Sequence, residues 1–441
     1  MEKQTLCKIG RGVSRRDFIR TSAAVTLAAM IPGSGSVFAA GSDRLKIGLV
    51  GCGGRGTGAV KDCVASSEGI ELVAMGDLFE DRLEASFTEL AAVLPKENLR
   101  VKNRNKYVGF DAYKKVIKSG IDIVLLVTPP GYRPEHVDYA VKSGVHVFME
   151  KPVAVDPVGV RSVIASSELA EKKSLAMVAG TQYRHHLPYL EIVQRIRDGQ
   201  IGEIIGGQSY SIRGWPGDWG EKALRFLNER EAGKISEMEY QCRNWYHFDW
   251  TCGDFIVEQA IHQLDAMNWM AGANPVKAIG MGARQARTGK EFGNIYDHFT
   301  VEYEYLDGQR LAHMCRQMEG VSVRISIRIT GTRGTVYASG NIAQITGEKP
   351  WMYEGESPNP QVTEHADLIR SIRSGKPLNE GRRIAETSLM AIMGRMSAYT
   401  GRELSRDWAM KDSALDLRPP KYEFGDTPIR EIPIPGKTQL V

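Results

Sequence analysis

The chain has 441 residues, which is too long for one ordinary hydrophobic core, and we expect two principal domains. A hydrophobic content of 42% and a charged content of 25% are typical of a globular protein and argue against a disordered or fibrous one. The formal net charge is +4, but basic and acidic residues balance once residues 1–39 are set aside. The remaining chain therefore has no excess charge that would favour nucleic acid or an anionic membrane as a partner.

Residues 1–40 are predicted to be an export signal. Basic residues precede an apolar stretch at 23–31, which is too short to span a bilayer, and small residues follow around Ala39. The motif SRRDFI at residues 14–19 resembles a twin-arginine signal, which carries proteins across the membrane already folded. We therefore expect a periplasmic protein, with a disordered tail or a membrane anchor as the alternative.

Residues 41–180 alternate short apolar runs with helical stretches. The predicted strands lie at 45–51, 70–77, 120–130, 144–152 and 175–182, and helices are predicted at 134–144 and 158–173. Strands separated by helices of this length predict an α/β fold with a doubly wound parallel sheet, covered by helices on both faces, as in a Rossmann domain.

A glycine-rich motif, Gly51-x-Gly53-x-x-Gly56, follows the first predicted strand and opens a helix. Such glycines allow a tight turn, close approach to a pyrophosphate and close helix packing. Asp77 ends the next strand, where it can accept hydrogen bonds from a ribose, so NAD is favoured over NADP; a helix N-cap is the alternative role. The predicted cofactor contacts are Gly51, Cys52, Gly53, Gly54, Arg55, Gly56, Asp77, Thr128, Pro129, Glu150 and Lys151.

Residues 181–405 alternate apolar and polar positions, with a turn at 306–308, which is typical of antiparallel strands. With helices predicted at 364–377 and 381–401, this region is expected to form an α+β domain with a large, mostly antiparallel open sheet. Its uncovered face predicts a homodimer or homotetramer. The tail at 406–441 is predicted to be irregular.

The cysteines outside the signal show no C-x-x-C spacing, so we expect no zinc site. We expect buried thiols, with a disulfide between Cys242 and Cys252 as the alternative.

Two segments carry candidate catalytic groups. Lys151 ends a predicted parallel strand, at the sheet edge where ligands bind, and could hydrogen-bond a substrate hydroxyl; an ordinary surface lysine is the alternative. Residues 253–270 are predicted to form one helix, with Glu258 and His262 spaced i, i+4 on one face. A carboxylate beside an imidazole raises its basicity, which suits a general base. A structural histidine, or a metal site on these two residues, is the alternative.

The glycine motif, Glu-Lys-Pro about 100 residues later and a helix with His-x-x-Asp together resemble the Gfo/Idh/MocA oxidoreductases, over nearly the whole chain after the signal. In that family a Rossmann domain is joined to an open α/β sheet domain. The resemblance implies that Lys151 and His262 act on a substrate hydroxyl. Glu258 and Ala260 depart from the family's common Asp-x-Gly-x-His form, which leaves the partner of His262 open.

Residues 244–254 contain four aromatic side chains, a histidine and two acids. Aromatic rings stack on sugars and polar groups read their hydroxyls, although core packing is the alternative. The segment GTQYRHHLPY resembles a family segment at the border of the pocket. The predicted substrate contacts are Arg184, His185, Trp245, Tyr246, His247, Trp250 and Asp265, and Tyr183 is a candidate additional acid/base.

The stretch at 243–265 resembles the exported branch of the family from carbohydrate-degrading bacteria, which implies a carbohydrate substrate. The first hypothesis is an NAD-dependent dehydrogenase that acts on a ring hydroxyl of a sugar or glycoside and holds its cofactor tightly. The second is a redox-neutral glycoside hydrolase that uses the same groups, and the third is a non-catalytic sugar-binding module with a vestigial cofactor site.

Overall fold

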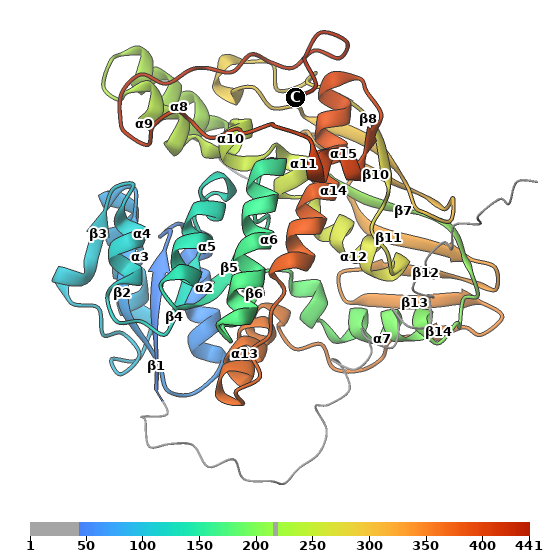
Figure 1. Ribbon diagram of the computed structural model, residues 1–441, viewed down its shortest axis with the longest axis horizontal. Coiled ribbons are helices and arrows are strands. Elements are labelled where there is room, and N and C mark those ends of the chain that lie inside the picture. Colours follow the sequence, from blue (N-terminus) through green and yellow to red (C-terminus); the bar gives the residue numbers. More distant parts are fainter. Residues whose placement is uncertain (1–43, 215–218) are drawn as a thin grey trace, which may run out of the picture. The chain divides into compact units, whose positions relative to one another are not determined.

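The computed structural model describes residues 44–214 and 219–441, which contain two β-sheets and the helices around them (Figure 1). The predicted export signal, including the SRRDFI motif, lies outside the described residues. Within the described ranges, no helix has the length and apolar character needed to cross a membrane.

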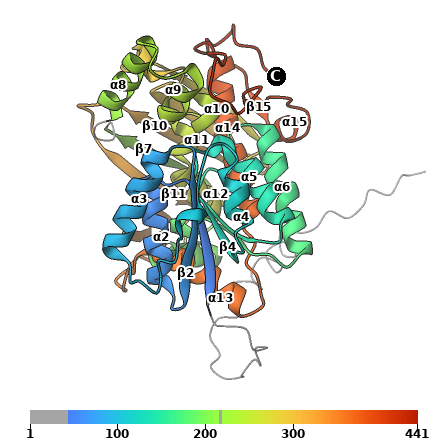
Figure 2. The ribbon, with the colours of Figure 1, turned by 90° about the vertical axis from the view of Figure 1, so that its left-hand side faces the viewer.

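The first sheet has six parallel strands in the order β3-β2-β1-β4-β5-β6. The strands are β1 Leu45–Val50, β2 Ile70–Asp77, β3 Lys106–Val108, β4 Ile123–Leu126, β5 His146–Met149 and β6 Met177–Ala179. The helices are α2 Gly54–Ser66, α3 Glu80–Val93, α4 Ala112–Ile117, α5 Arg133–Lys142 and α6 Pro157–Lys172, and the 3-10 turns are η1 Asn103–Asn105 and η2 Pro130–Tyr132. Figure 2 shows α2 and α3 on one side of the sheet and α4, α5 and α6 on the other. The predicted doubly wound domain is confirmed, because the strands are buried between two helical layers.

The second sheet has nine strands in the order β14-β13-β12-β11-β7-β10-β9-β8-β15. The strands are β7 Ile204–Arg213, β8 Lys277–Ala283, β9 His298–Glu304, β10 Arg310–Gln317, β11 Arg324–Gly331, β12 Gly334–Ser339, β13 Ile342–Gly347, β14 Trp351–Met352 and β15 Leu404–Ser405. Only the β7–β10 pair is parallel among the described pairs of this sheet, so the predicted, mostly antiparallel sheet is confirmed. One face is buried, whereas the other exposes side chains such as Ile279 and Met281.

The chain after β6 contributes the other described helices and 3-10 turns. They are α7 Leu187–Arg197, α8 Trp219–Glu231, α9 Glu237–Arg243, α10 Asp249–Cys252, α11 Phe255–Glu258, α12 Ile261–Ala271, α13 Pro360–Arg373, α14 Gly381–Thr400 and α15 Arg406–Lys411, with 3-10 turns η3 Gln182–His185, η4 Trp245–His247 and η5 Lys290–Phe292. α13 packs against α2, and α14 packs against both α6 and β8. These two helices tie the nine-stranded sheet to the Rossmann part of the chain.

The prediction of one continuous helix over 253–270 is wrong. The segment is divided into α11 and α12, because the N–H of Ala260 bonds to the carbonyl of Phe255 at 3.1 Å, one residue further back than in an α-helix. The entry to α11 is also irregular: Asp254 has φ +70° and its carboxylate accepts hydrogen bonds from the N–H groups of Phe255 and Tyr296. The break places Glu258 and His262 on separate short helices.

The five described cysteines are buried free thiols, as predicted, and the alternative Cys242–Cys252 disulfide is not formed. The tail after α15 has no regular secondary structure, in agreement with the prediction of an irregular tail. Figure 1 shows it, in dark red, running from α15 towards α8 and α9.

Candidate functional site

A cavity of about 910 Å³ lies at the carboxyl ends of the parallel strands, between the Rossmann part and the helices α8 to α12. This is the sheet edge at which doubly wound folds bind ligands. The predicted residues that line it are Gly51, Cys52, Gly53, Gly54, Arg55, Gly56, Asp77, Thr128, Pro129, Glu150, Lys151, Trp245, Tyr246, His247, Glu258 and His262. The fold therefore brings the glycine motif, the lysine and the histidine to one place. Within the described residues, no group of three or more His, Cys, Asp or Glu side chains could hold a metal ion.

The glycine motif has the shape needed for a dinucleotide. Gly51 has φ +98°, and a Cβ there would lie 2.6 Å from the backbone nitrogen of Thr128. A Cβ on Gly56 would lie 1.9 Å from the carbonyl oxygen of Gly51, whereas Gly53 and Gly54 face open space. α2 begins here with no acidic residue in its first turn and no side-chain cap from the described chain, so its N-terminal N–H groups suit a pyrophosphate. These residues fit NAD.

Asp77 has two partners within the protein. Its carboxylate accepts hydrogen bonds from the N–H of Cys52 at 2.6 Å and from the N–H of Phe79 at 2.9 Å. Burial raises the pKa of Asp77, and the two N–H groups oppose that rise. The alternative role of Asp77 as a helix N-cap is not realised, because Phe79 occupies the N-cap position of α3. Asp77 also lines the cavity, where its remaining lone pairs can accept ribose hydroxyls.

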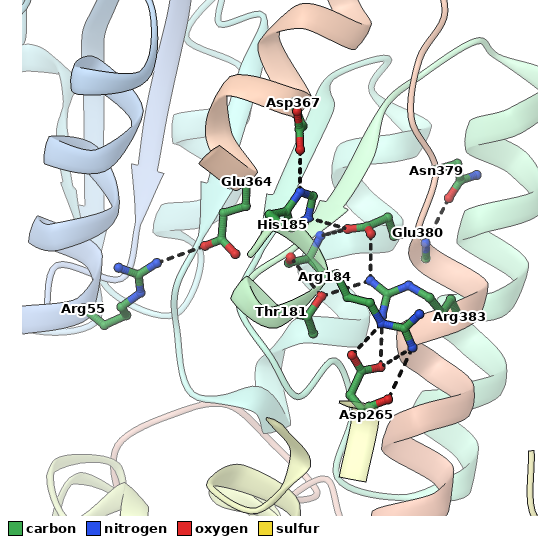
Figure 3. A network of polar contacts seen from close by, with 12 residues as sticks. Arg55, Thr181, Arg184, His185, Asp265, Glu364, Asp367, Asn379, Glu380 and Arg383 are labelled. Atoms are coloured by element: carbon green, nitrogen blue, oxygen red, sulfur yellow. Dashed lines mark hydrogen bonds and ion pairs between the residues drawn. The ribbon is translucent and has the colours of Figure 1, made fainter. Parts of the chain in front are cut away.

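Arg55 is held by three carboxylates: Glu150 at 2.5 Å, Asp62 at 2.8 Å and Glu364 at 3.3 Å. Burial lowers the pKa of Arg55, but Glu150 and the other two acids outweigh it and the pKa lies above its ordinary value. Because its charge is neutralised inside the protein, Arg55 is poorly suited to attract the additional phosphate of NADP. Its guanidinium instead joins α2 to the residue after β5, Glu150. It also joins α2 to Glu364 of α13 (Figure 3).

Lys151 and Glu258 form a buried ion pair in the cavity wall. The ammonium of Lys151 donates to the carboxylate of Glu258 at 2.8 Å and to its backbone carbonyl at 2.6 Å. Gln259 donates from its amide to the other carboxylate oxygen at 2.5 Å. The predicted partnership of Glu258 with His262 is therefore wrong, since both carboxylate oxygens of Glu258 are already bound to other side chains.

His262 lines the cavity, and its Nδ1 is buried without a hydrogen-bond partner in the described part of the chain. Burial, followed by the charges of Lys151 and Arg213, places the pKa of His262 well below its ordinary value. The imidazole is therefore neutral near pH 7 and able to accept a proton. Asp265 does not orient the ring directly, because its carboxylate binds Arg184 and Arg383.

Aromatic side chains form another wall of the cavity. Trp219 at the start of α8 contacts Tyr246 edge-on at 4.4 Å between ring centroids and Trp245 at 6.0 Å, and all three line the cavity. His247 lies beside them with its Nδ1 2.7 Å from Asn244 Oδ1, and burial lowers the pKa of His247 to about 3. Trp219 was not predicted, because it lies well before the aromatic cluster at 244–254 and no motif surrounds it.

Three predicted substrate contacts lie outside the cavity, in a buried polar network (Figure 3). Arg184 pairs with Asp265 at 2.8 Å, and Asp265 also pairs with Arg383 at 3.0 Å. His185 bonds to Asp367 at 2.6 Å. Because these side chains satisfy one another between η3, α12, α13 and α14, their assignment as substrate contacts is corrected to a structural role.

Two further predictions are corrected in the same way. Trp250 is 4% exposed and donates from its indole N–H to Gln241 at 2.7 Å, so it belongs to the core. Tyr183 does not line the cavity. Its ring stacks on Tyr189 at 4.4 Å, and its edge contact with His262 has a centroid distance of 6.0 Å. No local sequence pattern distinguishes polar aromatic side chains that line a cavity from those that pack behind it.

Comparison with protein families gives two matches. Residues 45–180 match the model described as an oxidoreductase family with an NAD-binding Rossmann fold, and residues 193–379 match the model of that family's C-terminal alpha/beta domain. The first match contains all six strands of the parallel sheet, and the second contains the strands β7 to β14 of the nine-stranded sheet.

Individual relatives are distant. A scyllo-inositol 2-dehydrogenase (NAD(+)) from Bacillus subtilis (strain 168) is 23% identical over 54% of this chain and 57% of its own length. A glycosyl hydrolase family 109 protein 3 from Phocaeicola vulgatus is 24% identical over 74% of this chain and 56% of its own length. The chain thus spans a little over half the length of these curated relatives.

Among solved structures, the aldose-aldose oxidoreductase from Caulobacter crescentus complexed with glycerol has a TM-score of 0.62 and 18% identity, over 82% of this chain and 99% of that one. At this identity the likeness establishes a shared fold.

Proposed function

The chain belongs to the Gfo/Idh/MocA oxidoreductase family, and from this premise we propose that it is an NAD-dependent enzyme that oxidises a ring hydroxyl of a sugar or glycoside. The observation that carries the proposal is the meeting of Lys151 and His262 with the glycine motif in one cavity. NAD, when bound, supplies the hydride acceptor.

The residues that would hold NAD are the glycine motif, the N-terminus of α2 and Asp77, with Thr128 and Pro129 on the neighbouring strand end. The ion pairs of Arg55 favour NAD over NADP. Lys151 and Glu150 follow β5 directly, so they border the same space.

Lys151 and His262 have complementary properties for work on a hydroxyl group. His262 is a neutral imidazole in the cavity wall and can take the hydroxyl proton. Lys151, which is paired with Glu258 at 2.8 Å, can donate a hydrogen bond that favours the alkoxide form of the substrate oxygen. Together they can hold a secondary alcohol by its oxygen and remove its proton.

A carbohydrate substrate is supported by the aromatic wall. Trp219 and Trp245 each offer a partly exposed ring at the cavity, and rings of this kind stack on the apolar face of a sugar. The names of the relatives, which include an inositol dehydrogenase and an aldose oxidoreductase, point to ring polyols and sugars.

We further propose that NAD is held tightly and that the protein works in the periplasm. Free NAD would be scarce there, and a twin-arginine route would allow folding around the cofactor before export. Tight retention is supported by the C-terminal strap, residues 412–441. Its Phe424 stacks on Phe79 with 6.0 Å between ring centroids and contacts Phe110 at 5.2 Å, and both of those rings line the cavity near Asp77.

A redox-neutral glycoside hydrolase is the second candidate function, and it is favoured by the relative named glycosyl hydrolase family 109 protein 3. It would use the same proton acceptor and lysine on the same hydroxyl. The position of Tyr183 outside the cavity disfavours that side chain as the additional acid/base of such a reaction.

The experiment is a substrate panel on the purified protein with its own cofactor: scyllo-inositol, myo-inositol, glucose and para-nitrophenyl glycosides. Reduction of bound nicotinamide by a sugar supports the dehydrogenase, and release of the phenol without net reduction supports the hydrolase. Trp245→Ala should raise the KM of an active sugar about tenfold, because a stacking face is lost. Sugar binding without either reaction, unaffected by Lys151→Ala and His262→Ala, would indicate the non-catalytic module instead.

A further inference from the structure

Arg213 does not line the cavity that contains Lys151 and His262. It is the last residue of β7, a central strand of the nine-stranded sheet. Its backbone is opposite Gln317 of β10, and the preceding residue is opposite Arg324 of β11. Because both neighbouring strands fix the main chain, the guanidinium extends from a rigid base towards the break between α11 and α12.

A chain of hydrogen bonds runs from Arg213 to Lys151. Arg213 Nη1 donates to Gln259 Oε1 at 3.1 Å, Gln259 Nε2 donates to Glu258 Oε2 at 2.5 Å, and Lys151 Nζ donates to Glu258 Oε1 at 2.8 Å. A guanidinium only donates and a carboxylate only accepts. One orientation of the Gln259 amide therefore satisfies both neighbours, and turning the amide over would break both bonds.

The guanidinium of Arg213 makes its main polar contact with Gln259, within this series of hydrogen bonds. Across residues 44–214 and 219–441 it forms no ion pair with a carboxylate, and its other hydrogen bond goes to the hydroxyl of Ser211 at 3.4 Å. A half-buried cation without a counter-ion is costly, and a charged donor binds an amide oxygen more strongly than a neutral one. The amide of Gln259 is thus the main acceptor for the guanidinium.

We propose that Arg213 is a positioning residue of the reaction: it fixes the amide of Gln259, which holds the Glu258 carboxylate against the ammonium of Lys151. The inference rests on the proposed role of Lys151 towards the substrate hydroxyl. It adds that a residue of the second sheet determines the position of the Lys151 ammonium, through the side chains at the break between α11 and α12. Without the guanidinium, Gln259 loses its preferred orientation, Glu258 gains rotational freedom and Lys151 becomes less well placed.

The test compares Arg213→Met and Gln259→Met with Arg213→Lys and with the control Arg328→Met, which changes an exposed arginine on the neighbouring strand β11. The first measurement needs no substrate. The folded protein with its cofactor is labelled with trace acetic anhydride, and the labelling rate of Lys151 is divided by that of the exposed Lys142 in the same digest.

We expect Lys151 to be labelled about tenfold faster in Arg213→Met and in Gln259→Met, with the double variant no faster than either one, because both act through one chain of bonds. Arg213→Lys keeps a charged donor and should recover part of the protection. Arg328→Met should equal the wild type. Unchanged labelling of Lys151 in Arg213→Met, or additive effects in the double variant, would overturn the proposal.

The second measurement uses the sugar of the panel that reduces the bound nicotinamide. Arg213→Met should lower kcat about tenfold and change KM less than about twofold. The position of the Lys151 ammonium changes, whereas the side chains that contact the sugar remain. A rise in KM at constant kcat would contradict a positioning role and assign Arg213 to binding. If no sugar reacts with the wild type, the proposed function fails while the labelling result still decides the role of Arg213.

Discussion

The ammonium of Lys151 binds Glu258 twice, at the carboxylate and at the backbone carbonyl, with distances of 2.8 Å and 2.6 Å. In a continuous α-helix that carbonyl would accept the N–H four residues later, which belongs to His262. Here the helix breaks after Glu258, and the carbonyl of Glu258 accepts a hydrogen bond from Lys151 instead. The local irregularity thus serves to bring a cation to the place where the substrate hydroxyl is expected.

Lys151→Met should lower kcat for sugar-dependent reduction of bound nicotinamide by about 10³-fold, because the donor to the substrate oxygen is lost. The bound cofactor should remain at the wild-type level, since the glycine motif and Asp77 are unchanged. The measurement is single-turnover absorbance together with the cofactor content. A variant with wild-type kcat would remove Lys151 from the reaction.

The pH dependence follows from His262. Its pKa lies well below the ordinary value of a histidine because of burial and the neighbouring cations Lys151 and Arg213. As the base must be neutral, kcat/KM should stay constant as the pH falls to about 6.5 and decline only at lower pH. His262→Gln should lower the plateau by about 10²-fold or more. A decline already centred near pH 7 in the wild type would mean that another group, or a histidine with an ordinary pKa, takes the proton.

The C-terminal strap should control cofactor retention. Phe424→Ala removes the ring that stacks on Phe79 and contacts Phe110, so NAD should leave the protein severalfold, up to about tenfold, faster. Ile432→Ala, elsewhere on the strap at a half-exposed side chain, is the matched control. The dissociation rate is followed by exchange of bound NAD for an excess of a labelled form. Equal rates in Phe424→Ala and the control would show that the strap does not hold the pocket wall.

Asp265 should matter for stability and little for substrate binding. It is 1% exposed and forms ion pairs with both Arg184 and Arg383. Asp265→Asn leaves the largely buried guanidinium of Arg184 without its carboxylate, whereas Arg383 keeps its ion pair with Glu380 at 2.8 Å. We expect a loss of about 3–5 kcal/mol in the free energy of unfolding, measured by denaturant titration, with KM unchanged. The exposed Asp407→Asn should change neither quantity. A raised KM with normal stability would restore the sequence-based assignment of Asp265 to the substrate.

The features predicted from sequence are those with local signals. The glycine motif, Asp77 and Lys151 follow strands whose apolar runs are unmistakable, and parallel strands bring their carboxyl ends to one edge. The helix break at Gln259 could not be predicted, because the residues on either side of it continue to look helical and the wide turn depends on tertiary partners such as Arg213.

The other wrong predictions also concern contacts between residues that are far apart in the sequence. Arg184 and Asp265 have the side chains of a substrate site, and only the fold shows that each is the partner of the other. Trp219 lines the site from the start of a helix, and Phe424 packs on the lining residue Phe79 from an irregular tail. Neither segment carries a periodic pattern that would place it there.

The central claim, an oxidoreductase that retains its own NAD, is tested most directly by one experiment on the purified, folded protein. The sugar panel is added without external NAD while the absorbance of reduced nicotinamide is followed, and the protein is then denatured and the released nucleotide identified. We predict about one equivalent of NAD per chain, reduced by at least one sugar of the panel. Absence of any bound nicotinamide, together with no affinity for added NAD, would contradict the account.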